Sequence, residues 1–140
     1  MSYPIKLENG NELWIALTLW QPWATMIEAG AKTIETRKWR TTYRGGVLIC
    51  AGKTIDPRYA SSGFRLSDLP LGQAVCTARL VDCHRMTEAD EPGARCKTYP
   101  GAWAWVLEEI RAITPFPVRG QPGFFEVEVP HCVIDWSIGR

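Results

Sequence analysis

Apolar residues occur along the chain mainly in short runs or in alternation with polar residues. Both patterns are typical of β-strands, whereas an amphipathic helix repeats its apolar residues every three or four positions. The predicted strands cover residues 13–18, 33–39, 47–51, 74–82, 102–113 and 124–129. The second half of the stretch over 102–113 fits a helix equally well, and residues 114–117 are expected to end it.

Few segments have a helical pattern. One helix is predicted over residues 23–29, with Pro22 in its first turn and Gly30 in the left-handed conformation that commonly ends helices. A short second helix is predicted over residues 56–60. Residues 84–100 are predicted to form a long irregular loop, and loops of that length in compact domains often act as lids or mobile insertions.

These elements predict the α+β class, as a small, mostly antiparallel β-barrel of about five to six strands with peripheral helices. The chain has 140 residues, 46% of them hydrophobic and 22% charged, which predicts one folded domain over residues 1–140. No apolar run approaches the roughly 20 residues that cross a membrane, and the first residues lack a secretory signal. We therefore expect a cytoplasmic protein without a membrane partner.

The charge is unevenly distributed. The formal net charge is only +1, but residues 32–65 contain five arginines and three lysines against two acidic residues. A local cationic segment on a nearly neutral protein favours a focused anion-binding site over a general nucleic-acid coat. A solvated positive surface without a ligand is the alternative interpretation.

The five cysteines do not indicate a disulfide framework. An odd number without a secretory signal predicts reduced thiols, and Cys50 and Cys76 lie in apolar runs where burial is expected. No Cys or His pair has the short spacing of a structural zinc site, and the chain has neither a glycine-rich phosphate loop nor a dinucleotide fingerprint. No metal and no cofactor is therefore predicted.

The residues best suited to ligand chemistry lie between the predicted helix and the second predicted strand. Lys32 stands in the tight connection, and Glu35 and Arg37 are two positions apart, on one face of the strand. Arginine offers a planar fork to a phosphate, a carboxylate or a base edge, and lysine offers a point charge. Glutamate holds either cation or accepts a proton. A structural Glu–Arg pair on a half-buried strand is the alternative.

A set of motifs follows a known order along the chain. Residues 30–37, GAKTIETR, have the pattern G-x-K-x-x-E-x-R. The other motifs are LWQPWA at 19–24, YRG at 43–45, LICAGK at 48–53, LPLG at 69–72, ARLVD at 78–82, WAWVL at 103–107 and PVRGQPG at 117–123. The ordered set spans about residues 13–128 and resembles the ASCH domain (ASC-1 homology) family of the PUA-like superfamily.

The resemblance implies a small β-barrel with a cleft that contains the signature. The family is generally thought to bind RNA or nucleotides, so the expected partners are RNA, another single-stranded nucleic acid, a nucleotide or a modified nucleoside. Some relatives act as amidohydrolases on N4-acylated cytidine, and others have been proposed to cleave RNA. The signature places Lys32, Glu35 and Arg37 in the cleft, and Lys53 matches the basic residue that ends a conserved strand.

Aromatic residues are the second group suited to nucleic acids. Trp20 and Trp23 flank the start of the predicted helix, and we expect them to line the cleft and to stack on bases. Gln21, between them, completes the predicted ligand-binding set. Trp105 is expected in the core, and packing is the alternative for each tryptophan.

Two departures from the family favour binding over catalysis. Amidohydrolase relatives carry a threonine where this chain has Glu35, and Cys50 stands where relatives often have histidine. If the protein is an enzyme, Lys32 or Glu35 is the expected general base. A ribonuclease would instead need His84 and His131, and nothing in the sequence places these residues beside the signature.

Overall fold

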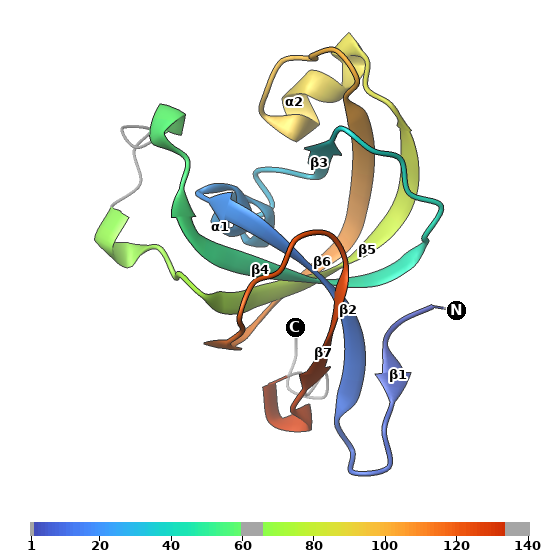
Figure 1. The fold of residues 1–140 in the computed structure, drawn as a ribbon, viewed down its shortest axis with the longest axis vertical. Coiled ribbons are helices and arrows are strands. Elements are labelled where there is room, and N and C mark those ends of the chain that lie inside the picture. The colour runs from blue at the N-terminus through green and yellow to red at the C-terminus, as the bar shows by residue number, and fades with distance from the viewer. Residues whose placement is uncertain (1, 60–65, 134–140) are drawn as a thin grey trace.

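Seven strands form one sheet in the computed structural model, which describes residues 2–59 and 66–133 (Figure 1). The strands are β1 (Ile5–Lys6), β2 (Glu12–Gln21), β3 (Ile34–Arg37), β4 (Gly45–Ile55), β5 (Gln73–Arg85), β6 (Trp103–Pro117) and β7 (Phe125–Val129). Their order is β1–β2–β4–β5–β6–β3, and β7 pairs with β2 off this path. β1, only two residues long, is absent from the sequence prediction.

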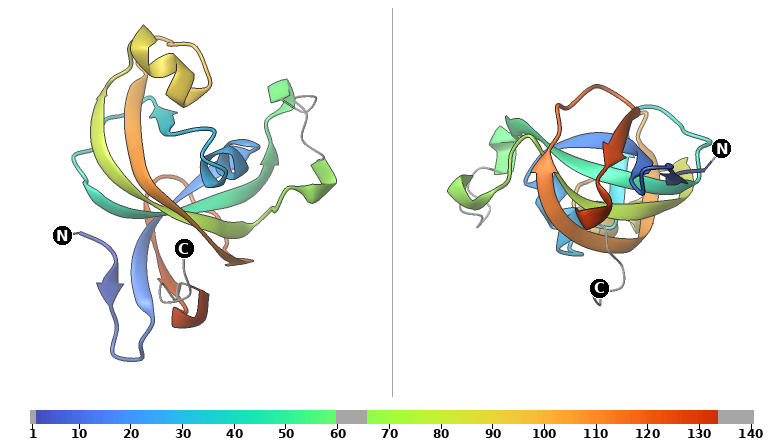
Figure 2. Two further views of the ribbon diagram at one scale, coloured as in Figure 1. Left: turned by 180° about the vertical axis from the view of Figure 1, so that it is seen from behind. Right: turned by 90° about the horizontal axis from the view of Figure 1, so that it is seen from below.

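The sheet is mostly antiparallel, as predicted. Among the described pairings only β2 and β4 run parallel. Seen from below, the sheet curls into a partly closed barrel (Figure 2). Three register shifts between β5 and β6 contribute to this curvature, because a bulge bends its strand and increases the local twist. The predicted α+β, barrel-like class is therefore confirmed.

The early helix forms where the sequence predicts it. α1 (Trp23–Glu28) follows β2, and Pro22 occupies the position before its first residue. Gly30 has a φ of +79°, the left-handed conformation that ends helices and that glycine adopts without strain. Ala24 and Ile27 of α1 are fully buried, and they belong to the main hydrophobic cluster with residues of β2, β4, β5 and β6.

The core has two main parts, one on each face of β4. Val47 and Ile49 pack in the cluster that includes α1, whereas Leu48 and Cys50 pack in the second cluster. Successive side chains of a strand point to opposite faces, which explains this division. The unbroken apolar run of β4 thus reflects a strand that is buried on both sides.

Two predictions for the second half of the chain are wrong. Residues 84–100, predicted as an irregular loop, contain the end of β5, a 3-10 turn η3 (Glu88–Asp90) and the short helix α2 (Glu91–Ala94). A capping box formed by Thr87 and Asp90 starts this turn. The strand predicted over residues 102–113 is confirmed and its second half is not helical, but residues 114–117 do not end it, because β6 keeps pairing with β5 as far as Pro117.

The remaining elements are single turns. The helix predicted over residues 56–60 is a 3-10 turn, η1 (Pro57–Tyr59), and residue 60 lies outside the described residues. Two further turns are η2 (Leu66–Asp68) and η4 (His131–Val133). Within the described part of the chain, every helix is too short to cross a membrane.

Candidate functional site

At one end of the barrel, α2 lies above β3 (Figure 1). A pocket of about 790 Å³ is lined by residues of β2, α1 and β3, by residues just after β4, and by the end of α2 and the segment after it. The lining residues are Thr18, Leu19, Trp20, Trp23, Lys32, Glu35, Thr36, Arg37, Lys38, Asp56, Arg58, Ala94, Cys96, Lys97, Thr98 and Tyr99. Five of these side chains are cationic and two are anionic, so the pocket favours an anionic ligand.

Lys32 lies at the inner end of the pocket. Its side chain is 3% exposed, and its Nζ donates a hydrogen bond of 2.7 Å to the carbonyl oxygen of Ala94. The ammonium also lies 3.5 Å from Glu35 Oε1 and 5.2 Å from the centre of the Trp23 ring. A buried charge needs such partners, and the carbonyl, the carboxylate and the ring face supply them.

Glu35 and Arg37 extend this cluster toward the solvent. Oε2 of Glu35 accepts a hydrogen bond from Arg37 Nε, and it lies 3.1 Å from Arg37 Nη2. The same Nη2 donates to the carbonyl oxygen of Thr18 on β2, at 3.0 Å. β7 pairs with β2 only as far as Ala16, so Arg37 bonds to β2 beyond the end of that pairing. The structure thus brings together the three groups of the predicted signature.

A strand over residues 33–39 is expected to place Glu35 and Arg37 on one face and Thr36 and Lys38 on the other, and this expectation holds only in part. Glu35 and Arg37 share the pocket, as expected, but Thr36 and Lys38 also line it. β3 is an edge strand that pairs with β6 alone among the described strands, and Lys38 lies beyond its last residue. Residues from both faces of β3 therefore line the pocket near the end of this strand.

A second ionic group, which sequence reasoning missed, also lines the pocket. The carboxylate of Asp56 accepts hydrogen bonds from Arg58 Nε and Nη2 at 3.2 and 2.9 Å, and from Trp23 Nε1 at 3.2 Å. The bonds from the Arg58 side chain lower the pKa of Asp56, which keeps this carboxylate ionised. Most of the Arg58 side chain is exposed. The sequence indicated Asp56 only as the start of a helix.

The aromatic residues lie largely where they were expected. Trp20 is 52% exposed and lines the pocket, and the half-buried Trp23 lines it as well. Trp105 is fully buried, as predicted, and donates a hydrogen bond from Nε1 to the carbonyl oxygen of Trp39. Tyr99, which the sequence did not single out, adds a third aromatic side chain to the pocket.

Two residues of the predicted ligand-binding set, Gln21 and Lys53, do not line the pocket, whereas Cys50 is buried as expected. Gln21 is fully buried, because its amide bonds to the carbonyl oxygen of Pro70 and to Thr25 at the start of α1. Lys53 is exposed and does not line the pocket, since its side chain lies along Gly72 instead. Cys50 lies in the second core cluster, where burial raises the pKa of its thiol to about 12.

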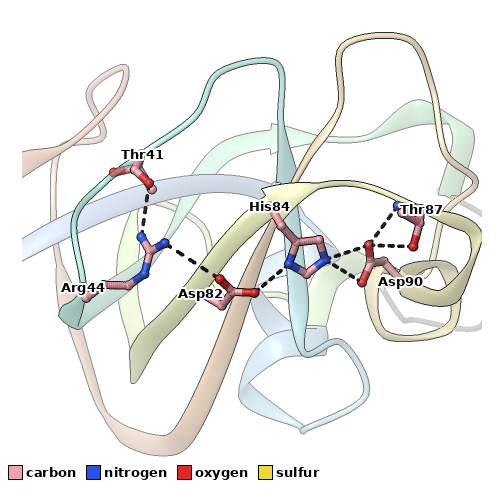
Figure 3. A network of polar contacts seen from close by, with 6 residues as sticks. All are labelled: Thr41, Arg44, Asp82, His84, Thr87 and Asp90. Atoms are coloured by element: carbon pink, nitrogen blue, oxygen red, sulfur yellow. Dashed lines mark hydrogen bonds and ion pairs between the residues drawn. The ribbon is translucent and has the colours of Figure 1, made fainter.

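Both histidines lie outside the pocket. His84 stands between the carboxylates of Asp82 and Asp90 (Figure 3), and His131 contacts Asn11 near the other end of the chain. Among residues 2–59 and 66–133, no group of three or more His, Cys, Asp or Glu side chains is arranged to hold a metal ion.

The comparisons with known proteins agree with this architecture. A family model described as ASCH domain matches residues 17–117. Activating signal cointegrator 1 of Mus musculus is 26% identical over 128 residues, which cover 80% of this chain and 22% of that protein. This chain therefore spans less than a quarter of the length of that curated relative.

Two solved structures share the fold. The crystal structure of ASCH from Zymomonas mobilis has a TM-score of 0.57 at 16% identity, and the match covers 83% of this chain and 87% of that one. A mutant form of the same protein has a TM-score of 0.54, with the same identity and coverage. Since the family model matches more than half of the residues, the chain belongs to the ASCH domain family.

Proposed function

We propose that the pocket binds a nucleotide or an unpaired segment of RNA. The observation that carries this proposal is the lining of the pocket, which includes five cationic side chains, two carboxylates and the exposed ring of Trp20. Cations attract phosphates, and an exposed indole offers a face on which a base stacks. Membership of the ASCH family adds to this support.

The cations of the pocket fall into two groups. Lys32, Arg37 and Arg58 are held by carboxylates, so they form a fixed framework. Lys38 and Lys97 are exposed on the pocket wall. We expect these two lysines to contact phosphates, because an exposed ammonium reaches an incoming anion without first breaking an ion pair.

The contacts of Glu35 favour binding over hydrolysis. A general base must accept a proton from water or from the substrate. Both oxygens of Glu35 already face cations, Lys32 on one side and Arg37 on the other. Hydrolysis of an N4-acylated cytidine and cleavage of RNA are therefore the less favoured functions. Incubation of the protein with each substrate, followed by chromatography of the products, tests them directly.

The experiment measures binding of fluorescein-labelled hexacytidylate by anisotropy at several salt concentrations. Lys38→Ala and Lys97→Ala should each weaken binding and each reduce the slope of log K against log salt by about 0.7, the value for one phosphate contact on a single strand. Trp20→Ala should weaken binding by about 1–3 kcal/mol for one lost stacked base. The matched control is Lys6→Ala on β1, an exposed lysine outside the pocket, which should bind like the wild type.

Two results would contradict the proposal. One is binding that does not respond to salt, and the other is equal affinity of the pocket variants and Lys6→Ala. Lys53→Ala tests a further point, because the sequence predicts a ligand contact at Lys53 and the structure places this residue outside the pocket. We expect this variant to keep the wild-type affinity.

A further inference from the structure

His84 on β5 lies between two carboxylates (Figure 3). Its Nδ1 is 2.7 Å from Asp82 Oδ2, and its Nε2 is 3.0 Å from both carboxylate oxygens of Asp90. A neutral imidazole has a single N–H and can donate to only one of these groups. With both carboxylates ionised, both contacts are hydrogen bonds only when the ring is an imidazolium, so the geometry favours the protonated form.

The charges around His84 favour this protonated form. Asp82 comes from its own strand and lies 3.8 Å from Arg44, whereas Asp90 comes from η3. β6 places the uncharged Ala104 opposite His84, and the neighbouring Arg85 stacks on Trp103. The bonds to Asp82 and then to Asp90 raise the pKa of His84, although partial burial opposes this effect.

The two carboxylates remain ionised beside the imidazolium. The hydrogen bond from His84 lowers the pKa of Asp82. Burial alone would raise the pKa of Asp90, but hydrogen bonds from the Thr87 backbone N–H and from His84 outweigh it, and this pKa is lowered. Over the pH range in which both carboxylates are charged and His84 is protonated, the imidazolium therefore links Asp82 on β5 to Asp90 on η3.

Asp90 connects this network to the wall of the pocket. It belongs to the segment of residues 87–99, named here the cap segment, which contains η3, α2 and the pocket residues Ala94 and 96–99. At the end of α2, Gly93 O accepts a hydrogen bond of 2.9 Å from Thr33 N, and Ala94 O accepts the bond from Lys32. The cap segment is therefore attached to the sheet by His84 near its start and by the signature segment at Gly93 and Ala94.

We propose that His84 is a positioning residue of the pocket, which in its protonated form holds the cap segment against Lys32. The part of this inference that concerns ligand affinity rests on the proposed function. When His84 loses its proton, the positive charge that attracts both carboxylates is lost and only one of them keeps a hydrogen bond, so the contact with Asp90 is weakened in either tautomer. Because the pKa is raised on folding, the stabilisation is complete below the unfolded value and is lost as pH rises through the folded value.

The first test needs no ligand. NMR of the full chain measures the pKa of His84 and the hydrogen-exchange protection factors of amides in the cap segment, with β4 amides as the internal reference. In the wild type, protection of the cap segment should fall as pH rises through the measured pKa of His84. His84→Gln should remove this pH dependence, and the matched variant His131→Gln should keep it. Asp90→Asn should lower the pKa of His84, which gives a second readout if His84→Gln folds poorly.

The second test measures binding of tetramethylrhodamine-labelled hexacytidylate between pH 6 and pH 9 at constant salt. The label, the phosphodiesters and the cytosines of this probe do not titrate in that range, so a change in affinity comes from the protein. Wild type and His131→Gln should lose about threefold or more in affinity as His84 deprotonates, whereas His84→Gln should change little.

The outcomes separate the two proposals. Protection that is independent of pH in the wild type, or a pH profile of His84→Gln equal to that of the wild type, overturns the role of His84. A pH-dependent cap segment without RNA binding at any pH leaves the role of His84 standing and contradicts the proposed function instead. RNA binding without the expected pH profile supports the function and overturns the inference.

Discussion

Glu35→Gln removes the carboxylate charge between Lys32 and Arg37 while keeping the size of the side chain. Lys32 is 3% exposed, so the variant leaves a buried ammonium with neutral partners only, among them the Ala94 carbonyl and the Trp23 ring face. Removing one partner of a buried ion pair costs about 3–5 kcal/mol. The side chain of Arg37 is 22% exposed and regains water, which places the expected loss near the lower limit, about 3 kcal/mol.

This loss is large enough to measure by two methods. For 140 residues the entropy of unfolding is about 0.3 kcal/mol per kelvin, so a loss of about 3 kcal/mol lowers the thermal midpoint by roughly 10 °C. Urea titration followed by tryptophan fluorescence gives the free energy of unfolding itself. The matched control is Glu108→Gln, which removes an exposed carboxylate on β6 and should change this free energy by less than about 0.5 kcal/mol.

A double variant tests the cause of the loss. Lys32→Met combined with Glu35→Gln leaves no buried unpaired charge, so it should be more stable than Glu35→Gln alone. The reasoning is refuted if Glu35→Gln unfolds within about 0.5 kcal/mol of the wild type. It is also refuted if Lys32→Met adds a further loss to Glu35→Gln, because Lys32 would then be stabilising without its carboxylate.

Three further predictions concern the core and the close packing around it. Trp105→Ala should reduce the free energy of unfolding in urea by about 3–5 kcal/mol, because it empties a fully buried position. Gly46→Ala should reduce it by about 1–3 kcal/mol in the same assay, since a Cβ there would lie 2.8 Å from the Trp14 ring, and an unchanged midpoint would contradict this geometry. A thiol reagent at neutral pH should label the exposed Cys132 quickly and Cys50 only on unfolding, as mass spectrometry can follow, because burial raises the pKa of Cys50 to about 12.

The strands could be predicted because their apolar residues report burial directly. The run over 47–51 and the alternation over 124–129 each correspond to an observed strand, β4 and β7. The prediction failed over residues 84–100, where proline, glycine and acidic residues suggested a loop. There a capping box starts η3 and a proline stands in the first turn of α2. Elements of three or four residues are too short to show the hydrophobic periodicity from which helices are predicted.

The charged residues of the candidate site could be predicted only where they lie close together in the sequence. Lys32, Glu35 and Arg37 lie within six positions, so the turn after α1 brings their charges together. Asp56 and Lys97 reach the same pocket through long-range packing, which no local pattern encodes. Gln21 belongs to a family motif, but its amide is used inside the protein, and the motif does not distinguish a ligand contact from a structural one.

The hydrogen bond from Arg37 to Thr18 spans the gap in the barrel wall. β3 is the far edge of the strand path, and β2 near Thr18 has gone past its pairing with β7, so a guanidinium connects β3 to β2 where the described strands form no backbone ladder. A ligand bound by Trp20 and Arg37 at once would connect the two strands on either side of this gap. Such a ligand binds only the folded protein, so at about a hundred times its Kd it would add about 2.7 kcal/mol to the free energy of unfolding.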